Sequence, residues 1–203
     1  MTDLLIWELG EGAADRAVIA VHGRTLSPED MQDRSQGFTG LQGVRFLAPR
    51  APGSTWYPKP FLEPIPDNEP SLTESLAAID AAVDAAIEAG FAGDRIALWG
   101  FSQGACLVSH WLLTRPRPVG AAILHTGGFI GPDALERPAG PLPIPIVMRS
   151  IEHDPFVPAS RVHETAELLR AAGATVDLRI EPGDEHIVTD EAMAASSELL
   201  RRL

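Results

Sequence analysis

The sequence contains one cysteine, Cys106, and has no long apolar run. One cysteine cannot form an internal disulfide, so the sequence does not indicate an oxidising compartment. Residues 1–8 lack both the basic start and the run of about 7–15 apolar residues that a secretory signal peptide needs. No segment approaches the ~20 apolar residues of a membrane-spanning helix. We therefore expect a cytoplasmic protein with no membrane partner.

Positive charge is also scarce, because the 16 Lys and Arg residues are outnumbered by 28 Asp and Glu residues, which gives a formal net charge of −12. Such a chain repels phosphate backbones and anionic lipids, and its charge favours solubility. No basic stripe interrupts the acidic pattern, so we expect no nucleic-acid partner. The six histidines fall at no zinc-ligand spacing and a cysteine pair is lacking. We expect neither a metal ion nor a cofactor.

What the chain does have is an ordinary globular composition, with 45% hydrophobic and 22% charged residues. Its length fits one domain over residues 1–203, since domains usually hold about 100–200 residues. Short apolar runs alternate with helical patterns. Strands are predicted at residues 17–21, 45–48, 95–99, 121–124, 144–148 and 175–180, with a weaker one near 4–7. Helices are predicted from 71 to a stop at 90, over 103–114, around 162–169 with a stop at 173, and over about 189–203.

Strands alternating with helices predict a parallel sheet with helices on both faces. The first predicted helix has a start signal, because Ser71 and Glu74 match a capping box. In parallel sheets of this kind, ligands bind beyond the carboxyl ends of the strands. Candidate site residues are therefore those that directly follow a predicted strand.

Gly100-Phe101-Ser102-Gln103-Gly104 fits the pattern G-x-S-x-G between a predicted strand and a predicted helix. That context is what the nucleophile-elbow motif requires. The turn is tight and strained, and the serine must stand clear at the top of the sheet. Side chains two residues to either side would crowd the neighbouring backbone, so glycine is expected at both places. The sequence predicts Ser102 as a nucleophile.

A serine nucleophile needs a base, and the order along this fold is Ser, then Asp or Glu, then His. His186 follows the last predicted strand and is the predicted base. His110 and His163 lie in predicted helices and His125 precedes the acid, so we interpret those three as packing or surface residues.

For the acid, Asp154 follows the fifth predicted strand and leaves room for a strand and a helix before His186. Glu152 is the runner-up by the same reasoning about the triad. Asp184 stands two residues before His186 without a rigid mount, and we interpret it as a solvated loop charge.

Two N–H donors must stabilise the tetrahedral intermediate of acyl transfer. One comes from the residue after the nucleophile, here Gln103, and the other from the loop after the first central strand, where Arg24 is the best candidate. His22 precedes that position, and we interpret it as a brace for the loop rather than as a catalytic group. Cys106 is expected to be a small buried apolar residue.

Residues 49–70 contain seven prolines and show no periodicity, although Trp56, Tyr57 and Phe61 argue against disorder. Two interpretations stay open for this segment: a wall of the substrate pocket, or a proline-stiffened loop packed on the sheet edge. Phe129 and Phe156 lie near predicted strand ends. They either line the pocket as well or belong to the local core.

These motifs together resemble the phospholipase/carboxylesterase family of small α/β-hydrolases, relatives of the acyl-protein thioesterases. The resemblance rests on His22-Gly23-Arg24, Ala51-Pro52 through Pro58, Gly100 through Ala105, Asp154 through Pro158, and Pro182-Gly183 through His186. The Trp56-Tyr57-Pro58 and Ile130-Gly131-Pro132 stretches are most similar to bacterial esterases, including ones associated with hydroquinone stress. Thr25 departs from the pattern, because many relatives have glycine there, and it implies a stiffer or differently shaped oxyanion loop.

The resemblance implies an α/β-hydrolase fold with no separate lid domain, a Ser102–His186–Asp154 triad, and Asp154 rather than Glu152 as the acid. It implies cleavage of a small-molecule ester or thioester and is compatible with a homodimer. A carboxylesterase for small soluble esters is the first hypothesis. A thioesterase or lysophospholipase for long acyl chains is the second, and a non-catalytic binding protein is the third.

Overall fold

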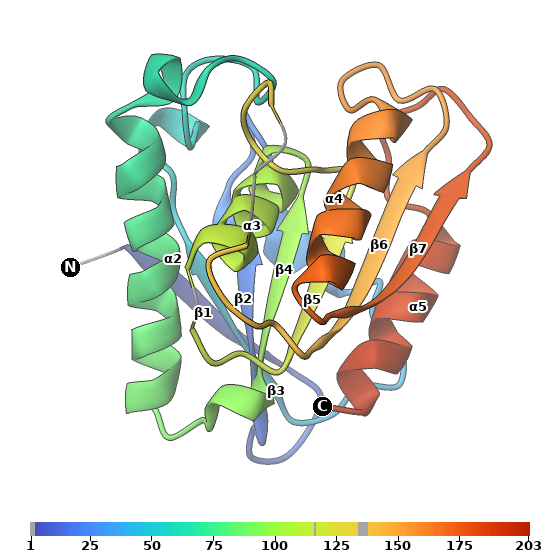
Figure 1. The fold of residues 1–203 in the computed structure, drawn as a ribbon. Helices are drawn as coiled ribbons and strands as arrows, with labels where there is room; N and C mark the ends of the chain where they lie inside the picture. Colours follow the sequence, from blue (N-terminus) through green and yellow to red (C-terminus); the bar gives the residue numbers. More distant parts are fainter. Residues whose placement is uncertain (1–2, 116, 134–137) are drawn as a thin grey trace.

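The computed structural model describes residues 3–115, 117–133 and 138–203. In these ranges the strands form one sheet of seven, in the order β1-β3-β2-β4-β5-β6-β7 (Figure 1). β1 pairs antiparallel with β3, and all other pairs are parallel. The strands are β1 (Leu4–Leu9), β2 (Arg16–Val21), β3 (Val44–Pro49), β4 (Ile96–Phe101), β5 (Ala121–His125), β6 (Pro145–Ile151) and β7 (Thr175–Glu181).

Helices cover both faces of this sheet (Figure 1). They are α1 (Pro28–Ser35), α2 (Ser71–Glu88), α3 (Gln103–Thr114), α4 (Ala159–Ala171) and α5 (Asp190–Arg201), with short 3₁₀ turns at Pro52–Ser54, Ile65–Asn68 and Gly93–Arg95. Side chains of β2 alternate between two hydrophobic clusters: Ile19 belongs to the cluster that includes residues of α2, α3 and α4, and Val18 to the one that includes residues of α1 and α5. The period of two along a strand therefore supplies apolar side chains to both layers.

The predicted strands and helices are confirmed, and so is the predicted α/β-hydrolase fold. The weakly predicted first strand, β1, is present. It lies at an edge of the sheet, and among its residues only Trp7 is buried. Helix α1 was missed because its sequence is mostly polar and contributes chiefly Met31 to the core. Its start signal is nevertheless a capping box, in which the Ser27 backbone N–H donates to the Asp30 carboxylate at 2.8 Å.

The predicted capping box at Ser71 and Glu74 is wrong. Ser71 is the first helical residue of α2, and the preceding Pro70 offers no side chain to cap the helix. The Glu69 carboxylate instead accepts hydrogen bonds from the Thr73 N–H (3.0 Å) and hydroxyl (2.9 Å). An acid just outside the first turn satisfies a free N–H group there and favours the positive end of the helix dipole.

None of the helices in the described ranges has both the length and the apolar character needed to cross a bilayer.

Candidate active site

The turn between β4 and α3 is strained at one residue, Ser102. Its φ is 54° and its ψ is −122°, in a region that residues with a side chain seldom occupy. Two backbone hydrogen bonds hold it there: the Ser102 N–H donates to the His125 carbonyl, and the Cys106 N–H donates to the Ser102 carbonyl, each at 2.9 Å. The strand-turn-helix placement predicted for the serine is therefore present.

The glycines on either side are required by close approach rather than by backbone angle. A Cβ on Gly104 would lie 2.1 Å from the Val21 carbonyl oxygen and 2.5 Å from that of His22. A Cβ on Gly100 would lie 2.6 Å from the Ala105 Cα. All of these obstacles are backbone atoms of packed elements, so a methyl group could be accommodated only by moving the turn.

We expect Gly104→Ala to lower the free energy of unfolding by about 2–3 kcal/mol, because it overpacks the contact between α3 and the end of β2. We expect kcat to fall about 100-fold as well, since the turn that carries Ser102 must shift. Denaturant titration and steady-state kinetics on a short ester measure both effects.

Gly37→Ala is the matched control. The nearest atom to a Cβ there is the flexible end of Met193, at 3.1 Å, and its expected cost is about 1 kcal/mol or less. Equal stability losses in the two variants would contradict the packing explanation.

Three side chains that are distant in sequence meet above this turn. His186 Nε2 lies 2.8 Å from Ser102 Oγ, and His186 Nδ1 lies 2.7 Å from Asp154 Oδ2. The other oxygen of Asp154 accepts hydrogen bonds from the Phe156 N–H (2.8 Å) and the Val157 N–H (3.0 Å). The Asp154 carboxylate thus faces donors on both oxygens. It favours the imidazole tautomer with the proton on Nδ1, which leaves Nε2 free to accept the serine proton.

Asp154 is kept ionised by these donors. Burial of the carboxyl group opposes its ionisation, but the hydrogen bonds from His186 and from the two backbone N–H groups outweigh it. The pKa of Asp154 therefore lies below its ordinary value. An ionised, hydrogen-bonded carboxylate can orient His186 and stabilise the imidazolium form that a proton transfer would create.

The alternative candidates for the acid and the base lie outside this hydrogen-bond chain. Glu152 and Asp184 are exposed, and among the described residues neither bonds to His186. Burial lowers the pKa of His110 to about 4 and that of His125 to about 3, so both are neutral packing residues. His125 Nε2 contacts Ser196 Oγ at 2.9 Å rather than Ser102.

The loop after β2 is braced as the sequence suggested. His22 is fully buried, and its Nε2 accepts a hydrogen bond from the Ala51 N–H at 3.2 Å. Burial lowers the pKa of His22, which keeps the ring neutral and able to accept. Thr25 adopts φ 65°, a left-handed backbone conformation that favours glycine, which is the residue expected at this position in many relatives. Its N–H donates to Ser54 at 2.8 Å and its hydroxyl to the Arg24 carbonyl at 2.6 Å.

Arg24 and Gln103 have side-chain roles that the sequence did not suggest. The Arg24 guanidinium donates to the carbonyls of Tyr57 (2.8 Å), Lys59 (3.0 Å) and Pro58 (3.1 Å). The Gln103 amide accepts from the Trp56 N–H at 3.0 Å and donates to the Tyr57 carbonyl at 2.9 Å. These bonds fix the 56–59 loop beside Ser102, and no local pattern could reveal contacts between segments so far apart.

The main-chain N–H groups of Arg24 and Gln103 are both available. Gln103 is the first residue of α3, so its N–H has no partner within the helix. In the part of the chain that the structure describes, neither N–H donates to a protein atom. These two donors, one on the loop after β2 and one at the start of α3, could stabilise an oxyanion.

A cavity of about 710 Å³ opens at Ser102 and His186. Three of the five predicted pocket residues line it: Tyr57, Phe61 and Phe156. Tyr57 and Phe61 are nevertheless largely buried, whereas the Phe156 ring is 68% exposed and stands edge-on to His186, with ring centres 5.1 Å apart. Within residues 49–70, the pocket wall thus consists of Tyr57, Pro58, Pro60 and Phe61.

The other two predicted pocket residues, Trp56 and Phe129, are not brought to the cavity. Trp56 is 1% exposed, packs 4.8 Å from the His22 ring and donates its indole N–H to the His22 carbonyl at 2.7 Å. Phe129 is fully buried beneath the Arg161 guanidinium at 4.1 Å. Both rings belong to the hydrophobic core, where large apolar surfaces are more favourable than at a solvated pocket.

Cys106 also borders the cavity at 1% exposure. Burial raises the pKa of its thiol to about 12, so it is a neutral small residue, as predicted, and not a second nucleophile. Within residues 3–115, 117–133 and 138–203, no cluster of His, Cys, Asp and Glu is arranged to hold a metal ion.

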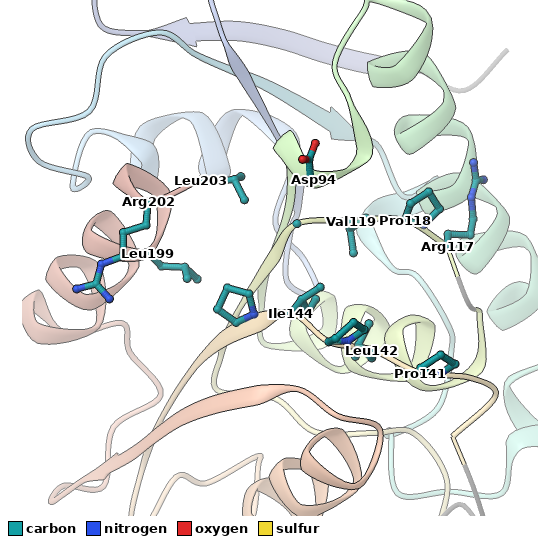
Figure 2. Close-up of a pocket in the computed structure, with 13 residues that line it drawn as sticks. Asp94, Arg117, Pro118, Val119, Pro141, Leu142, Ile144, Leu199, Arg202 and Leu203 are labelled. Carbon is teal, nitrogen blue, oxygen red and sulfur yellow. The ribbon is translucent and has the colours of Figure 1, made fainter.

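A second cavity of similar volume lies at the opposite end of the sheet, and Figure 2 shows the residues that line it. It adjoins the amino ends of β4, β5 and β6, near Asp94, Val119 and Ile144, and prolines and aliphatic residues dominate its wall. Its described lining includes no serine, cysteine or histidine. Since ligands of such sheets bind at the carboxyl ends of the strands, the cavity at Ser102 is the better candidate site.

Comparisons with known proteins identify the family and the fold of the chain. The family model described as Phospholipase/Carboxylesterase matches residues 10–203. Acyl-protein thioesterase 1 of Schizosaccharomyces pombe is 28% identical over 198 residues, which cover 88% of this chain and 86% of that protein. A crystal structure of a phospholipase/carboxylesterase from Dyadobacter fermentans superposes with a TM-score of 0.90 at 27% identity, covering 99% of this chain and 97% of that one. A Bacillus cereus carboxylesterase, at 18% identity, has the same fold with a TM-score of 0.79 over 100% of this chain and 94% of that one.

Proposed function

This chain belongs to the phospholipase/carboxylesterase family of α/β-hydrolases, and we propose that it is a serine carboxylesterase acting on small soluble esters. The observation that carries the proposal is the unbroken hydrogen-bond chain from Ser102 Oγ through His186 to Asp154, at 2.8 and 2.7 Å. A serine hydroxyl is a weak nucleophile unless such a base is within reach.

In the proposed reaction, His186 Nε2 accepts the Ser102 proton as Oγ attacks the ester carbonyl carbon. The carbonyl oxygen becomes an oxyanion, which the N–H groups of Arg24 and Gln103 stabilise. His186 then gives its proton to the departing alcohol oxygen, and an acyl-enzyme remains on Ser102. A water molecule attacks this acyl group with His186 again as base, and the acid leaves as Ser102 regains its proton.

The cavity supports a small substrate. A volume of about 710 Å³ falls inside the range of roughly 300–1,000 Å³ that is usual for small-molecule sites. The net charge of −12 makes anionic membranes a poor source of substrate. The triad geometry also argues against a non-catalytic binding protein, which would have no need of it.

A thioesterase is the second candidate, favoured by the match to acyl-protein thioesterase 1. Thioesters and esters would use the same Ser102 acyl-enzyme, so the leaving group and the acyl length must separate the two functions.

A fluorophosphonate probe tests for a reactive serine, and mass spectrometry should place the adduct on Ser102. A wild-type protein that resists labelling where control hydrolases react would refute the enzyme proposal. A series of p-nitrophenyl esters, with matched thioesters, then tests the substrate class. We expect kcat/KM to be greatest for short acyl esters; a maximum at long chains or a preference for thioesters would favour the second candidate.

A further inference from the structure

The cavity at Ser102 has a charge opposite to that of the whole molecule. The charged side chains in its described lining are two arginines, Arg24 and Arg34, and no aspartate or glutamate is among them. The chain as a whole carries a net charge of −12. A cavity wall with only cationic charge in an acidic protein attracts anions locally, where the low-dielectric walls strengthen the field.

The two arginines differ in what they bond. The Arg24 guanidinium donates hydrogen bonds to the carbonyls of residues 57–59. Most other arginines in the described ranges have a side-chain nitrogen within 4 Å of a carboxylate oxygen, Arg50 among them. In the described ranges Arg34 has neither an ion pair nor a side-chain hydrogen bond. Its N–H groups are therefore available to a ligand.

Arg34 is nevertheless held in place. Its guanidinium carbon lies 4.3 Å from the centre of the Phe101 ring, in a cation–π contact. A cation–π contact uses none of the guanidinium N–H groups as hydrogen-bond donors to oxygen, so they remain able to bind a carboxylate in a two-pronged manner.

The contact between Arg34 and Phe101 lies next to the proposed catalytic groups. Phe101 immediately precedes Ser102, and its ring centre is 5.3 Å from that of His186. One aromatic ring therefore separates Arg34 from the proposed base, on the wall of the cavity that contains Ser102. A charged group a few bonds from an ester carbonyl would come within reach of Arg34.

We propose that Arg34 binds a carboxylate of the substrate, so that the substrate class is short esters that carry a free carboxylate. Two arrangements have this chemistry: a monoester of a dicarboxylic acid, with the charge on the acyl side, or an acylated hydroxy acid, with the charge on the alcohol side. The proposal rests on the esterase function above and narrows it to one charge class.

Matched pairs of esters test it, because a carboxylate and a carboxamide have nearly the same shape and differ in charge. Monoethyl succinate against ethyl succinamate probes the acyl side, and acetoxyacetate against acetoxyacetamide probes the alcohol side. We expect the wild type to prefer the carboxylate of at least one pair by about 10-fold or more in kcat/KM, the range expected for a hydrogen-bonded ion pair. The preference should shrink as salt is added.

Arg34→Gln should reduce this preference to about 1 while changing kcat/KM for the carboxamide esters by no more than ~3-fold, and Arg34→Lys should restore part of it. Arg170→Gln is the control, since it removes one positive charge from an exposed arginine of α4 outside the cavity lining, and it should keep the wild-type preference. Equal rates within both pairs for the wild type, or a preference that survives Arg34→Gln, would overturn the proposal. An equal loss on both members of a pair would also overturn it, since Arg34 would then act on the reacting groups. Hydrolysis of the neutral esters and labelling of Ser102 report on the esterase function separately.

Discussion

Ser102→Ala is expected to lower kcat on a short p-nitrophenyl ester by about 10⁵-fold or more and to abolish labelling by a fluorophosphonate. Without Oγ the substrate carbonyl has no nucleophile, and His186 has no proton to accept at 2.8 Å. The residual rate would come from binding and from the two main-chain donors alone. The free energy of unfolding should change little, because the hydroxyl is only partly buried.

Ser109→Ala is the matched control for this variant. Ser109 is a buried serine of α3, the helix that follows Ser102, and its hydroxyl donates to the Ala105 carbonyl at 2.7 Å, not to the triad. Steady-state kinetics should show near wild-type kcat for Ser109→Ala. If Ser102→Ala kept more than about 1% of the wild-type kcat, another group would have to be the nucleophile.

Asp154→Asn is expected to lower kcat by about 10⁴-fold with the fold intact. The Phe156 and Val157 N–H groups need an acceptor, so the amide oxygen of the asparagine would face them, in the place of Asp154 Oδ1. Its NH₂ group would then face His186 Nδ1 in place of the oxygen now 2.7 Å away. A donor there forces the proton onto Nε2, and His186 can no longer accept the proton of Ser102.

The alternative acids provide the controls for that result. Glu152→Gln and Asp184→Asn remove exposed carboxylates that have no hydrogen bond to His186 in the described structure. Both should retain kcat within about 3-fold, a change of ~0.7 kcal/mol in the activation barrier. A loss in Asp184→Asn comparable to that in Asp154→Asn would mean that the acid had been assigned to the wrong residue.

Local sequence patterns were enough to predict most of the fold. Strands buried on both faces appear as continuous apolar runs, and helices repeat their apolar residues at a period near 3.6, so these elements were predicted within a few residues. The first strand gave a weak signal because it is at an edge, and α1 gave none because a short surface helix needs few apolar residues. The capping box at Ser71 failed because a nearby acid, Glu69, supplied the acceptor instead.

The same local logic placed Ser102, Asp154 and His186 each just after a strand. Parallel strands bring their carboxyl ends to one edge, so residues at these ends converge, and the structure has them within hydrogen-bonding distance. The predicted pocket was less accurate. Tyr57 and Trp56 are neighbours of similar character, yet of the two only Tyr57 borders the cavity, since the hydrogen bonds of the loop with Gln103 and Arg24 determine how it lies.

Sequence patterns alone determined the fold class, Ser102 and His186, because these depend on periodicity, on glycines at fixed offsets and on chain order, whereas the choice of Asp154 over Glu152 came from the family resemblance. Tertiary structure alone decided which aromatic rings face the cavity and that Arg24 holds the 57–59 loop. It also brought the Arg34 guanidinium over the Phe101 ring, with no carboxylate partner among the described residues. These features arise from contacts between segments far apart in the chain. Their free energy depends on packing and charge in three dimensions, which leave no periodic trace along the sequence.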